Sequence, residues 1–436
     1  MVKLWVVFVL VAIVLPKDSY SQRLRCIMEP DRSCSLLGAK VNPDEIMSTV
    51  FITRNASTLT TVQFKRSSLT AIPPGMFQDF PKLETLNASF CDVKQVLANN
   101  FGDAKTLQQL LLRGNKIHDL PEEAFFGANR LQLLDLSDNA ITIIESTAFK
   151  RLRDLKTLLL ARNQLTELPL SLFEDLSELE TLELQQNNLG AIDDQQFQEC
   201  HSLSKLNVSH NALKSFDLMQ FERRWSFDII DVSHNHLASV QVPSNLRQLV
   251  ATGNGIRTVE GIGVDAELIL LKMPHNKLAS VDNLPPFEKL ISLDVSYNRI
   301  REFDFRSVAC FTRLILLKLD GNQLETVSSS LTDAIPQLKY VHLADNHLTR
   351  LDLDMLWLVP RMLKLDLHGN RLEQIDATNL SASFPQLVRI MLEGNRFRCE
   401  ANQPLLKQLE SSNTAYAMNR ADCSKNETLV DGLCCS

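Results

Sequence analysis

The chain has 436 residues, of which 44% are hydrophobic and 22% charged. This globular composition excludes a disordered or collagen-like chain. The formal net charge of −7 argues against nucleic acid as a partner, because binding to phosphates requires clustered positive charge. Nine cysteines are too few for a small disulfide scaffold of this length, but most of them lie near the two ends.

The first segment, residues 1–21, has the pattern of a secretory signal peptide. Lys3 precedes an apolar run, residues 4–15, that is too short for the ~30 Å hydrocarbon core of a membrane. Ser19 and Ser21 fit the small positions of a cleavage site. The alternative is a buried N-terminal strand or helix. Since no later segment is apolar enough for a membrane span, we expect a secreted, extracellular protein that can keep disulfides.

A 24-residue period organises the chain over residues 59–397. The string LQQLLLRGNKI at 107–117 returns as LQLLDLSDNAI at 131–141 and LKTLLLARNQL at 155–165. The pattern LxxLxLxx(N/C)xL occurs about fifteen times, with Ser67 and Cys91 in the asparagine slot of the first two repeats. This pattern is that of a leucine-rich repeat array. Its repeat asparagines are Asn115, Asn139, Asn163, Asn187, Asn211, Asn235, Asn254, Asn276, Asn298, Asn322, Asn346, Asn370 and Asn395.

Each slot of the repeat has a physical role. The leucines point into a common core, the short strand between them lines the concave face, and the asparagine satisfies backbone groups at the following turn. A second ladder, on the convex side, consists of Phe77, Phe101, Phe125, Phe149, Phe173, Phe197 and Phe221. A single repeat cannot bury its apolar face, so we expect one α/β solenoid, a curved horseshoe of about 15 repeats with a parallel concave sheet. Shorter repeats over residues 236–298 predict either a hinge with altered curvature or simple sequence drift.

The open ends of the array predict disulfide-stapled caps. Cys26 and Cys34 are expected to pair in an N-terminal cap, residues 22–58, and residues 398–436 are expected to form a C-terminal cysteine cap and tail. In the C-terminal cap, an amphipathic helix (QPLLKQLES) lies between Cys399 and Cys423.

Two cysteine arrangements remain open in the C-terminal cap. Cys399 and Cys423 bond each other and leave Cys434 and Cys435 exposed for another chain, or all four form two internal bonds. Elsewhere Cys91, Cys200 and Cys310 lie too many repeats apart to pair, so we expect them to be free and buried.

The concave face is the expected binding surface. Leu111, Leu133 and Leu159 are expected to be exposed on three consecutive strands and to form one apolar patch, which favours a protein interface. Acidic and basic residues are equally frequent on this face, which argues against a uniform polyanion or polycation as the ligand. The polar residues assigned to the patch are Asp135, Arg162 and Glu183.

Other features of the sequence are weaker signals. Five Asn-x-Ser/Thr sequons predict a glycoprotein, and two of them, at Asn87 and Asn207, would carry glycans on the concave face. The chain has no HExxH, GxSxG or Gly-rich phosphate loop, so we expect no catalysis, cofactor or metal. His210 and His234 should lie ~5 Å apart in neighbouring repeats. Metal binding, a pH-sensitive contact and solvated surface histidines are the three interpretations of that pair. The complete set of sequons is Asn55, Asn87, Asn207, Asn379 and Asn426.

The signal peptide, the repeats, the acidic pI and the cysteine cluster ending in Cys434-Cys435 together resemble the leucine-rich immune molecules of mosquitoes. Most members carry coiled-coil heptads after the double cysteine, so the chain, which stops at Ser436, resembles the coil-less branch. The resemblance implies a circulating haemolymph factor that acts in innate immunity, by complement-like or antiparasite defence. It implies a protein ligand, either a complement-like thioester-containing protein or another leucine-rich immune molecule. It also favours a disulfide-linked dimer through the adjacent cysteines. The alternative function is that of an extracellular matrix, carrier or developmental leucine-rich repeat protein.

Overall fold

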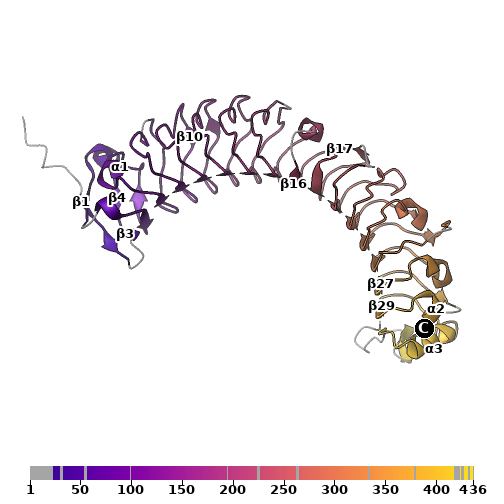
Figure 1. Ribbon diagram of the computed structural model, residues 1–436. Helices are drawn as coiled ribbons and strands as arrows, with labels where there is room; N and C mark the ends of the chain where they lie inside the picture. Colours follow the sequence, from indigo (N-terminus) through magenta and orange to yellow (C-terminus); the bar gives the residue numbers. More distant parts are fainter. Residues whose placement is uncertain are drawn as a thin grey trace, which may run out of the picture. The chain divides into compact units, whose positions relative to one another are not determined.

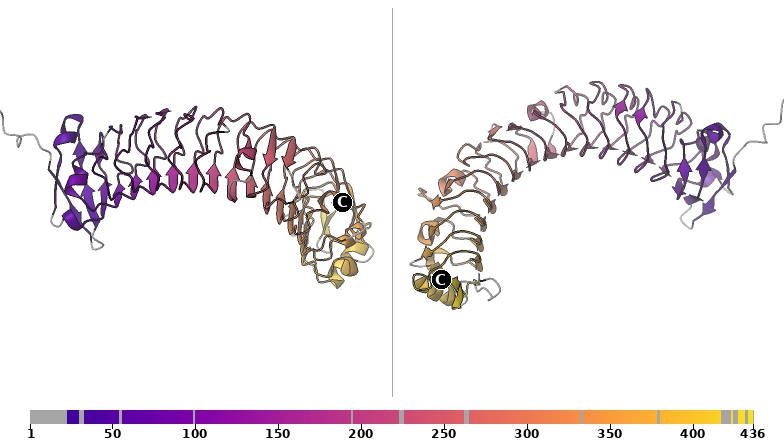
Figure 2. Two further views of the ribbon diagram at one scale, coloured as in Figure 1. Left: turned by 45° about the horizontal axis from the view of Figure 1, so that its top comes forward. Right: turned by 180° about the vertical axis from the view of Figure 1, so that it is seen from behind.

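The structure is a computed structural model that describes residues 23–29, 33–53, 56–98, 100–193, 195–222, 226–261, 265–331, 334–377, 380–416, 423, 427–430 and 433–435. The chain divides into two compact units, Met1–Leu155 and Lys156–Ser436, called unit 1 and unit 2. The boundary falls inside the predicted repeat array. In Figures 1 and 2 the strands of each unit follow one another along one side of successive turns.

Unit 1 is built on a parallel sheet with one strand per turn. Its strands are β3 (Ser33–Leu37), β6 (Thr61–Lys65), β8 (Thr85–Asn87), β9 (Gln109–Leu111) and β11 (Leu133–Asp135), with β2 (Ile27–Met28) antiparallel to β3. Smaller parallel pairs join β1 (Arg23–Arg25) to β5 (Val50–Ile52), β4 (Lys40–Val41) to β7 (Ser68–Leu69) and β10 (Asp119–Leu120) to β12 (Ile143–Ile144). The helices are α1 (Met76–Asp79) and two 3₁₀ turns, Pro43–Ser48 and Ala56–Thr58.

Unit 2 is likewise built on parallel strands, one per turn. The strands are β13 (Thr157–Leu159), β14 (Thr181–Glu183), β15 (Lys205–Asn207), β16 (Phe227–Asp231), β18 (Leu246–Val250), β20 (Leu270–Lys272), β21 (Ser292–Asp294), β23 (Leu316–Lys318), β25 (Tyr340–His342), β27 (Lys364–Asp366) and β29 (Arg389–Met391). The prediction of a leucine-rich repeat solenoid with one parallel strand per repeat is confirmed.

The remaining elements of unit 2 lie outside this sheet. Two-stranded sheets pair β17 (Ser239–Val242) with β19 (Thr258–Gly261), β22 (Glu302–Asp304) with β24 (Thr326–Ser328), β26 (Arg350–Asp352) with β28 (Gln374–Asp376) and β30 (Thr428–Val430) with β31 (Leu433–Cys435). The helices are α2 (Leu380–Ser383), α3 (Gln403–Ser411) and the 3₁₀ turns Leu218–Phe221, Phe305–Val308 and Leu353–Leu358. The helix α3 coincides with the predicted amphipathic segment and buries Leu405, Leu406 and Leu409.

The rings of the phenylalanine ladder are buried in both units. In unit 1 the rings of Phe77, Phe101, Phe125 and Phe149 follow one another with centroids 5.4–6.0 Å apart. In unit 2 the centroids of Phe173 and Phe197, and of Phe197 and Phe221, are each 5.7 Å apart. These spacings suit favourable ring contacts, so each turn packs mainly on its neighbours, as in other repeat proteins.

The asparagines tie each turn to the one before it. Asn187 is buried; its Oδ1 accepts a hydrogen bond from the Leu165 N–H at 3.1 Å, and its Nδ2 donates to the carbonyls of Leu160 and Leu184, each at 3.0 Å. One side chain thus satisfies three backbone groups of two turns. In the first repeat the Ser67 hydroxyl fills the slot, accepting from the Ala39 N–H at 3.0 Å and donating to a neighbouring carbonyl.

We expect Asn187→Ala to lower the free energy of unfolding by roughly 1–3 kcal/mol, because three backbone groups lose a buried partner. The matched control is Asn188→Ala, since the neighbouring Asn188 side chain is exposed. Thermal unfolding of the two variants beside the native protein measures the difference. Equal midpoints for both variants would contradict the role of this slot.

The N-terminal cap contains the predicted pair of cysteines. Cys26 and Cys34 are bonded, with their Cα atoms 5.5 Å apart. The bond joins the residue before β2 to the strand β3, and the Cys26 N–H donates to the Ile52 carbonyl at 3.2 Å. The hairpin of β2 and β3 therefore covers the first edge of the unit 1 sheet.

The C-terminal cap corrects the expected cysteine pairing. Cys399 bonds Cys435 and Cys423 bonds Cys434, so the expected Cys399–Cys423 bond is wrong, and neither adjacent cysteine is left for another chain. The reason is local geometry. The strand β31 pairs with β30 and bridges to Phe397, and successive side chains of a strand point to opposite faces. The two adjacent cysteines therefore reach different partners, which is the alternative of two internal bonds.

With both bonds inside one chain, we expect the secreted protein to run as a monomer on a gel without reductant. Peptide mapping should recover Cys399 linked to Cys435 and Cys423 linked to Cys434. A dimer band that disappears with reductant, and in a protein carrying Cys434→Ser and Cys435→Ser, would contradict this pairing.

The other three cysteines carry free thiols. Cys91 and Cys200 are buried, and burial raises the pKa of Cys91 to about 11 and that of Cys200 to about 12, so both stay protonated near neutral pH. Cys310 is only partly buried, which differs from the prediction. It lies between the 3₁₀ turn Phe305–Val308 and the buried Phe311, at a position that is partly open to solvent.

Candidate functional site

The solvent-facing side of the main sheet, called the strand face, is the surface that the sequence predicts for binding. In each three-residue strand of the main sheets the middle side chain is buried and its neighbours face outward; in β23, Leu317 is 0% exposed between Leu316 and Lys318. Parallel pairing places equivalent residues of successive strands ~4.8 Å apart. In unit 2 one such row carries charges of both signs: Lys272, Asp294, Lys318, His342 and Asp366.

Carboxylates and histidines gather at the end of this row. Asp366 is 4% exposed, and its two oxygens face two rings: His368 Nδ1 lies 2.7 Å from Oδ1, and His342 Nδ1 lies 3.6 Å from Oδ2. His368 Nε2 also lies 3.6 Å from Asp345 Oδ2. Asp320, on the strand face nearby, accepts a hydrogen bond from the Ala344 N–H at 3.0 Å. We call Asp320, His342, Asp345, Asp366 and His368 the acid–histidine cluster.

The cluster shifts the protonation of its own members. Burial raises the pKa of Asp320 to about 6, and the charges of Asp366 and Asp294 act in the same direction, against the bond from Ala344. Burial lowers the pKa of His342 despite the charge of Asp366. For His368 burial acts downward, but the hydrogen bond and charge of Asp366, with other carboxylates, outweigh it and raise the pKa. The charge of this part of the strand face therefore changes between weakly acidic and neutral pH.

We expect Asp320→Asn to raise the thermal midpoint at pH 7.5 and to leave it nearly unchanged at pH 4. A carboxyl whose pKa is raised by folding favours the folded state while protonated, and its charge destabilises the fold once the pH passes through about 6. The Asn side chain keeps an oxygen for the Ala344 N–H. The exposed Asp154→Asn serves as the control. A midpoint gain of equal size at both pH values would contradict the assignment.

The predicted apolar patch is corrected by the register. Leu111 pairs with Asp135 and Leu133 pairs with Gln109, so the two leucines lie diagonally rather than side by side, and both are partly buried. The expectation of one exposed patch is therefore wrong for this pair. The two leucines occupy different outward slots, one before and one after the buried middle residue. The prediction from sequence treated the outward position before the buried residue and the one after it as the same position.

The predicted patch residues that lie in unit 2 are Leu159, Arg162 and Glu183. Leu159, also partly buried, pairs with Glu183 on the neighbouring strand β14. Arg162 follows in the turn after β13, with an exposed side chain and a backbone N–H that donates to the Gln185 carbonyl at 2.9 Å.

The histidine pair is a stack of rings. The His210 and His234 centroids are 4.1 Å apart with an interplanar angle of 17°, and the pKa of His234 is lowered by burial and by the charge of His210. In the part of the chain that the structure describes, no group of His, Cys, Asp or Glu side chains is arranged to hold a metal ion. The pair therefore presents stacked ring faces rather than ring nitrogens that converge on one point.

Two sequons belong to a recurring turn on the strand face. The Asn87 and Asn207 Oδ1 atoms each accept a bond from the N–H of the serine two residues on, at 3.0 Å. Asp135, Asp231 and Asp294 make the same bond to a serine N–H at 2.9–3.1 Å. The turn uses the side-chain oxygen alone, so it is compatible with a glycan on the amide nitrogen. The sequons Asn55, Asn379 and Asn426 lie outside the described residues.

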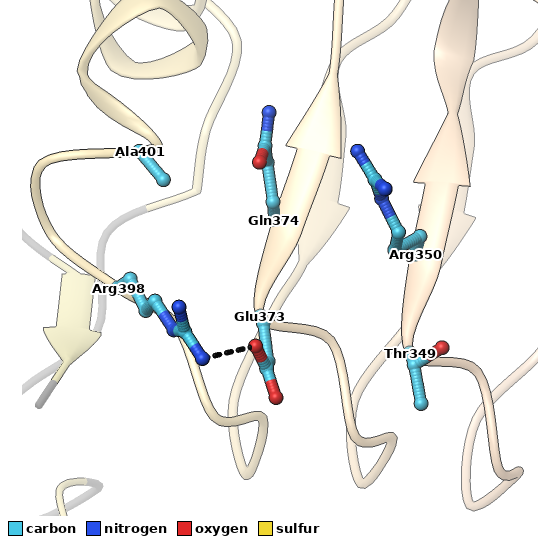
Figure 3. A pocket seen from close by; sticks show the side chains of 6 residues that line it. All are labelled: Thr349, Arg350, Glu373, Gln374, Arg398 and Ala401. Atoms are coloured by element: carbon cyan, nitrogen blue, oxygen red, sulfur yellow. Dashed lines mark ion pairs between the residues drawn. The ribbon is translucent and has the colours of Figure 1, made fainter.

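A polar pocket lies away from the strand face, between β26, β28 and the segment that leads to α3 (Figure 3). Its charged groups are paired internally. Arg398 lies 2.7 Å from Glu373, and Arg350 lies 3.7 Å from Asp376. Such pairing suits a structural contact at the end of the array better than a charged ligand.

Sequence reasoning did not find the acid–histidine cluster. Its acidic members were visible as outward residues, but His342 and His368 occupy different slots of different repeats. An alignment of the strands by their pairing register would have placed His342 beside Asp366. To find His368 as well, that alignment must include the position two residues after each strand.

Comparison with known proteins supports the repeat assignment. The family model "Leucine rich repeat" matches residues 105–165 and 153–213. Human fibromodulin is 30% identical over 131 residues, 30% of this chain and 33% of its own length. Human leucine-rich repeats and immunoglobulin-like domains protein 1 is 30% identical over 139 residues, 30% of this chain and 12% of its length. The chain thus matches about a third or less of these human proteins.

Two solved structures match nearly the whole chain. The APL1 leucine-rich repeat domain is 25% identical with a TM-score of 0.72, and the match covers 95% of this chain and 99% of that domain. A chain of the LRIM1/APL1C complex gives the same identity and TM-score, over 95% of this chain and 71% of its own length. The Drosophila Toll–Spatzle complex, at 17% identity and a TM-score of 0.60, shares the fold.

The repeats, the parallel strands and the asparagine ladder define a leucine-rich repeat protein. LRIM1, APL1C and APL1 are leucine-rich repeat immune proteins of mosquitoes, and the resemblance to that family is confirmed. None of the helices in the described part of the chain combines the length and the apolar character that a bilayer crossing requires.

Proposed function

We propose that this chain is a secreted recognition protein of innate immunity, which binds a protein partner through its strand face and performs no catalysis. The observation that carries the proposal is the match of 95% of the chain to the APL1 domain and to a chain of the LRIM1/APL1C complex. The second of these structures is a complex of two proteins, LRIM1 and APL1C. The proposed partner is accordingly another leucine-rich immune molecule or a complement-like thioester-containing protein.

The extracellular localisation of the protein is part of the same proposal. Residues 1–21 act as a secretory signal peptide and the mature chain circulates in haemolymph. The disulfides at both ends support an oxidising compartment, because such bonds persist there and are rare in the cytosol.

The charge pattern and the position of the sequons indicate which part of the strand face binds the partner. Glycans on Asn87 and Asn207 would cover β8 and β15 and hinder access to the strands beside them, where Leu111, Glu183 and Asp231 are the paired residues. The strand face from β20 to β27 carries no sequon and presents the mixed-charge row with the acid–histidine cluster. A mixed pattern of charge favours a partner of complementary pattern over a uniform polyion.

The proposal is tested by direct binding. The purified chain is immobilised and exposed separately to the APL1 domain and to a mosquito thioester-containing protein, with binding followed by surface plasmon resonance. Saturable binding to either supports the proposal. If neither binds, and haemolymph from infected animals yields no circulating immune protein, the proposal fails.

On the strand face from β20 to β27, we expect Tyr340→Glu to weaken partner binding at least tenfold without lowering the thermal midpoint by more than a few degrees, because the residue faces outward from β25 and is 37% exposed. The matched control is Ile143→Glu, which places the same charge on β12, outside the main sheet, at a residue 55% exposed. Equal affinity for both variants would place the interface on another part of the molecule.

The alternative is a matrix or carrier protein, which the partial match to fibromodulin favours. Transcript levels separate the two. Induction by infection supports the immune function, whereas expression restricted to developing connective tissue supports the matrix function.

A further inference from the structure

Two outward positions follow each ladder asparagine, one directly after it and the other two residues further on. The residue between them is buried: Ile256, Leu278 and Ile300 are 0%, 2% and 0% exposed. Arg257 directly precedes β19 and Arg301 directly precedes β22, so these positions lie between the main sheet and the small sheets. We call the two series of positions in unit 2 the first and the second flank row.

Four cations occupy the flank rows on three successive turns, and all four are exposed. We call them the cation cluster: Arg257, Lys277, Arg299 and Arg301. On these turns the first row reads Gly255, Lys277 and Arg299, and the second row reads Arg257, Ala279 and Arg301. No acidic residue occupies either row on these turns.

Backbone hydrogen bonds hold the three turns side by side. The Lys277 N–H donates to the Ile256 carbonyl at 2.9 Å. The Arg299 N–H donates to the Leu278 carbonyl, also at 2.9 Å. Successive turns are therefore spaced by ~4.8 Å, as paired strands are. The Lys277 ammonium group extends over the preceding turn, because a Cβ built on Gly255 would lie 3.6 Å from Lys277 Nζ.

Cations at equivalent positions elsewhere in the chain are paired with acidic residues. In unit 1 Lys116 Nζ lies 2.6 Å from Asp92 of the preceding turn, and in the second flank row Arg398 lies 2.7 Å from Glu373. No member of the cation cluster forms an ion pair with another residue in the part of the chain that the structure describes. Like charges on neighbouring turns repel each other, and a bound anion removes that repulsion.

The charges around the cation cluster extend along the first flank row. Among the residues that directly adjoin the cluster in the chain, only Glu302, next to Arg301, is acidic. The second row contains Glu325 and Glu373 further on. The first row continues without an acidic residue, as Gln323, His347, Arg371 and Arg396. Positive charge therefore follows the direction in which the turns succeed one another.

We propose that the cation cluster binds the sulfate groups of a linear anionic polysaccharide, which runs across the turns along the first flank row. Three of the four members are arginines, and a guanidinium group binds the oxygens of such an anion through two parallel hydrogen bonds. This activity goes beyond the proposed function, because the flank rows are separate from the strand face. The balance of charge that argues against a polyion concerns the strand face alone.

The surroundings of the cluster favour a polysaccharide over other polyanions. Neither flank row presents a large exposed apolar side chain on these turns, so a bilayer has nothing there to anchor it. Single-stranded nucleic acid stacks its bases on aromatic side chains. The nearest rings, His275 and Tyr297, are stacked on each other with centroids 4.5 Å apart, so no base fits between them. The disulfides at both ends suit the extracellular space, where sulfated polysaccharides occur.

The first experiment titrates the native protein with a heparin octasaccharide in an isothermal calorimeter at physiological salt. The cluster variant replaces the four cations by glutamine, and the control variant makes the same change of net charge at exposed cations of unit 1. We expect the cluster variant to lose affinity about tenfold or more and the control about twofold or less, because exposed ion contacts are weak unless several act together. Equal losses in the two variants, or no binding by the native protein, would overturn the proposal. The control substitutions are Lys82→Gln, Lys94→Gln, Lys105→Gln and Arg130→Gln.

Two further probes separate the classes of ligand. The native protein is titrated with hyaluronan oligosaccharide, which carries carboxylates but no sulfate, and with single-stranded oligothymidine. We expect both to bind more weakly than heparin. Oligothymidine that binds more tightly would make a nucleic acid the ligand, and hyaluronan that binds equally well would show that sulfate is not recognised; either result refutes the proposal.

A second variant serves if thermal unfolding shows that the cluster variant is not folded. Glu302→Gln removes the acidic side chain next to the cluster, so the affinity for heparin should rise about twofold. An unchanged or lower affinity would contradict the location of the site.

Binding of the protein partner distinguishes this inference from the proposed function. The cluster variant should bind the partner as tightly as the native chain does, because the strand face is unchanged. If it loses both heparin and the partner, the cluster belongs to the protein interface and the inference of a separate site fails. If the native chain binds heparin but no protein partner, the proposed function fails while the polysaccharide site stands.

Discussion

The structure depends on the satisfaction of backbone groups at the turn that follows each strand. A three-residue strand leaves its next carbonyls and N–H groups inside the solenoid, away from water, where an unsatisfied group costs about 1–3 kcal/mol. One asparagine per turn supplies an acceptor to the preceding turn and donors to both, as Asn187 and Asn346 do. Because two of these three bonds cross to the preceding turn, they also keep the turns in register.

That register determines which outward side chains lie beside one another on the surface. Within each unit, outward side chains align in rows because their strands pair without slippage, and a row brings together residues 19 or more positions apart in the chain. The acid–histidine cluster is a product of this arrangement. Asp366 is held between His342 and His368, and neither contact is visible in a single repeat. The surface chemistry of this fold therefore depends on rows of side chains, and a substitution in one turn acts mainly on the two turns beside it.

The sequence was sufficient for the fold and insufficient for most of the surface. The period predicted the strands, the buried leucines and the phenylalanine rings, because each is a local consequence of a repeated slot. The helix α3 was predicted from its own amphipathic sequence. The pairing of Cys399 with Cys435 was missed because it depends on a hairpin and on the direction in which two adjacent side chains point. The patch around Leu111 and Leu133 was misplaced because a one-slot shift along a strand was not distinguished from a position on the same row.

The turn at the end of several strands allows N-glycosylation sites to be gained by single substitutions. Asp135-Leu136-Ser137, Asp231-Val232-Ser233 and Asp294-Val295-Ser296 differ from an N-glycosylation acceptor by one atom group, the carboxylate in place of an amide. Asparagine can make the same bond to the serine N–H, as Asn87 and Asn207 do. A single Asp-to-Asn change can therefore add a sugar chain to a given strand at little structural cost. The reverse change uncovers the strand, so the fold gives evolution a reversible means of masking and exposing its strand face turn by turn.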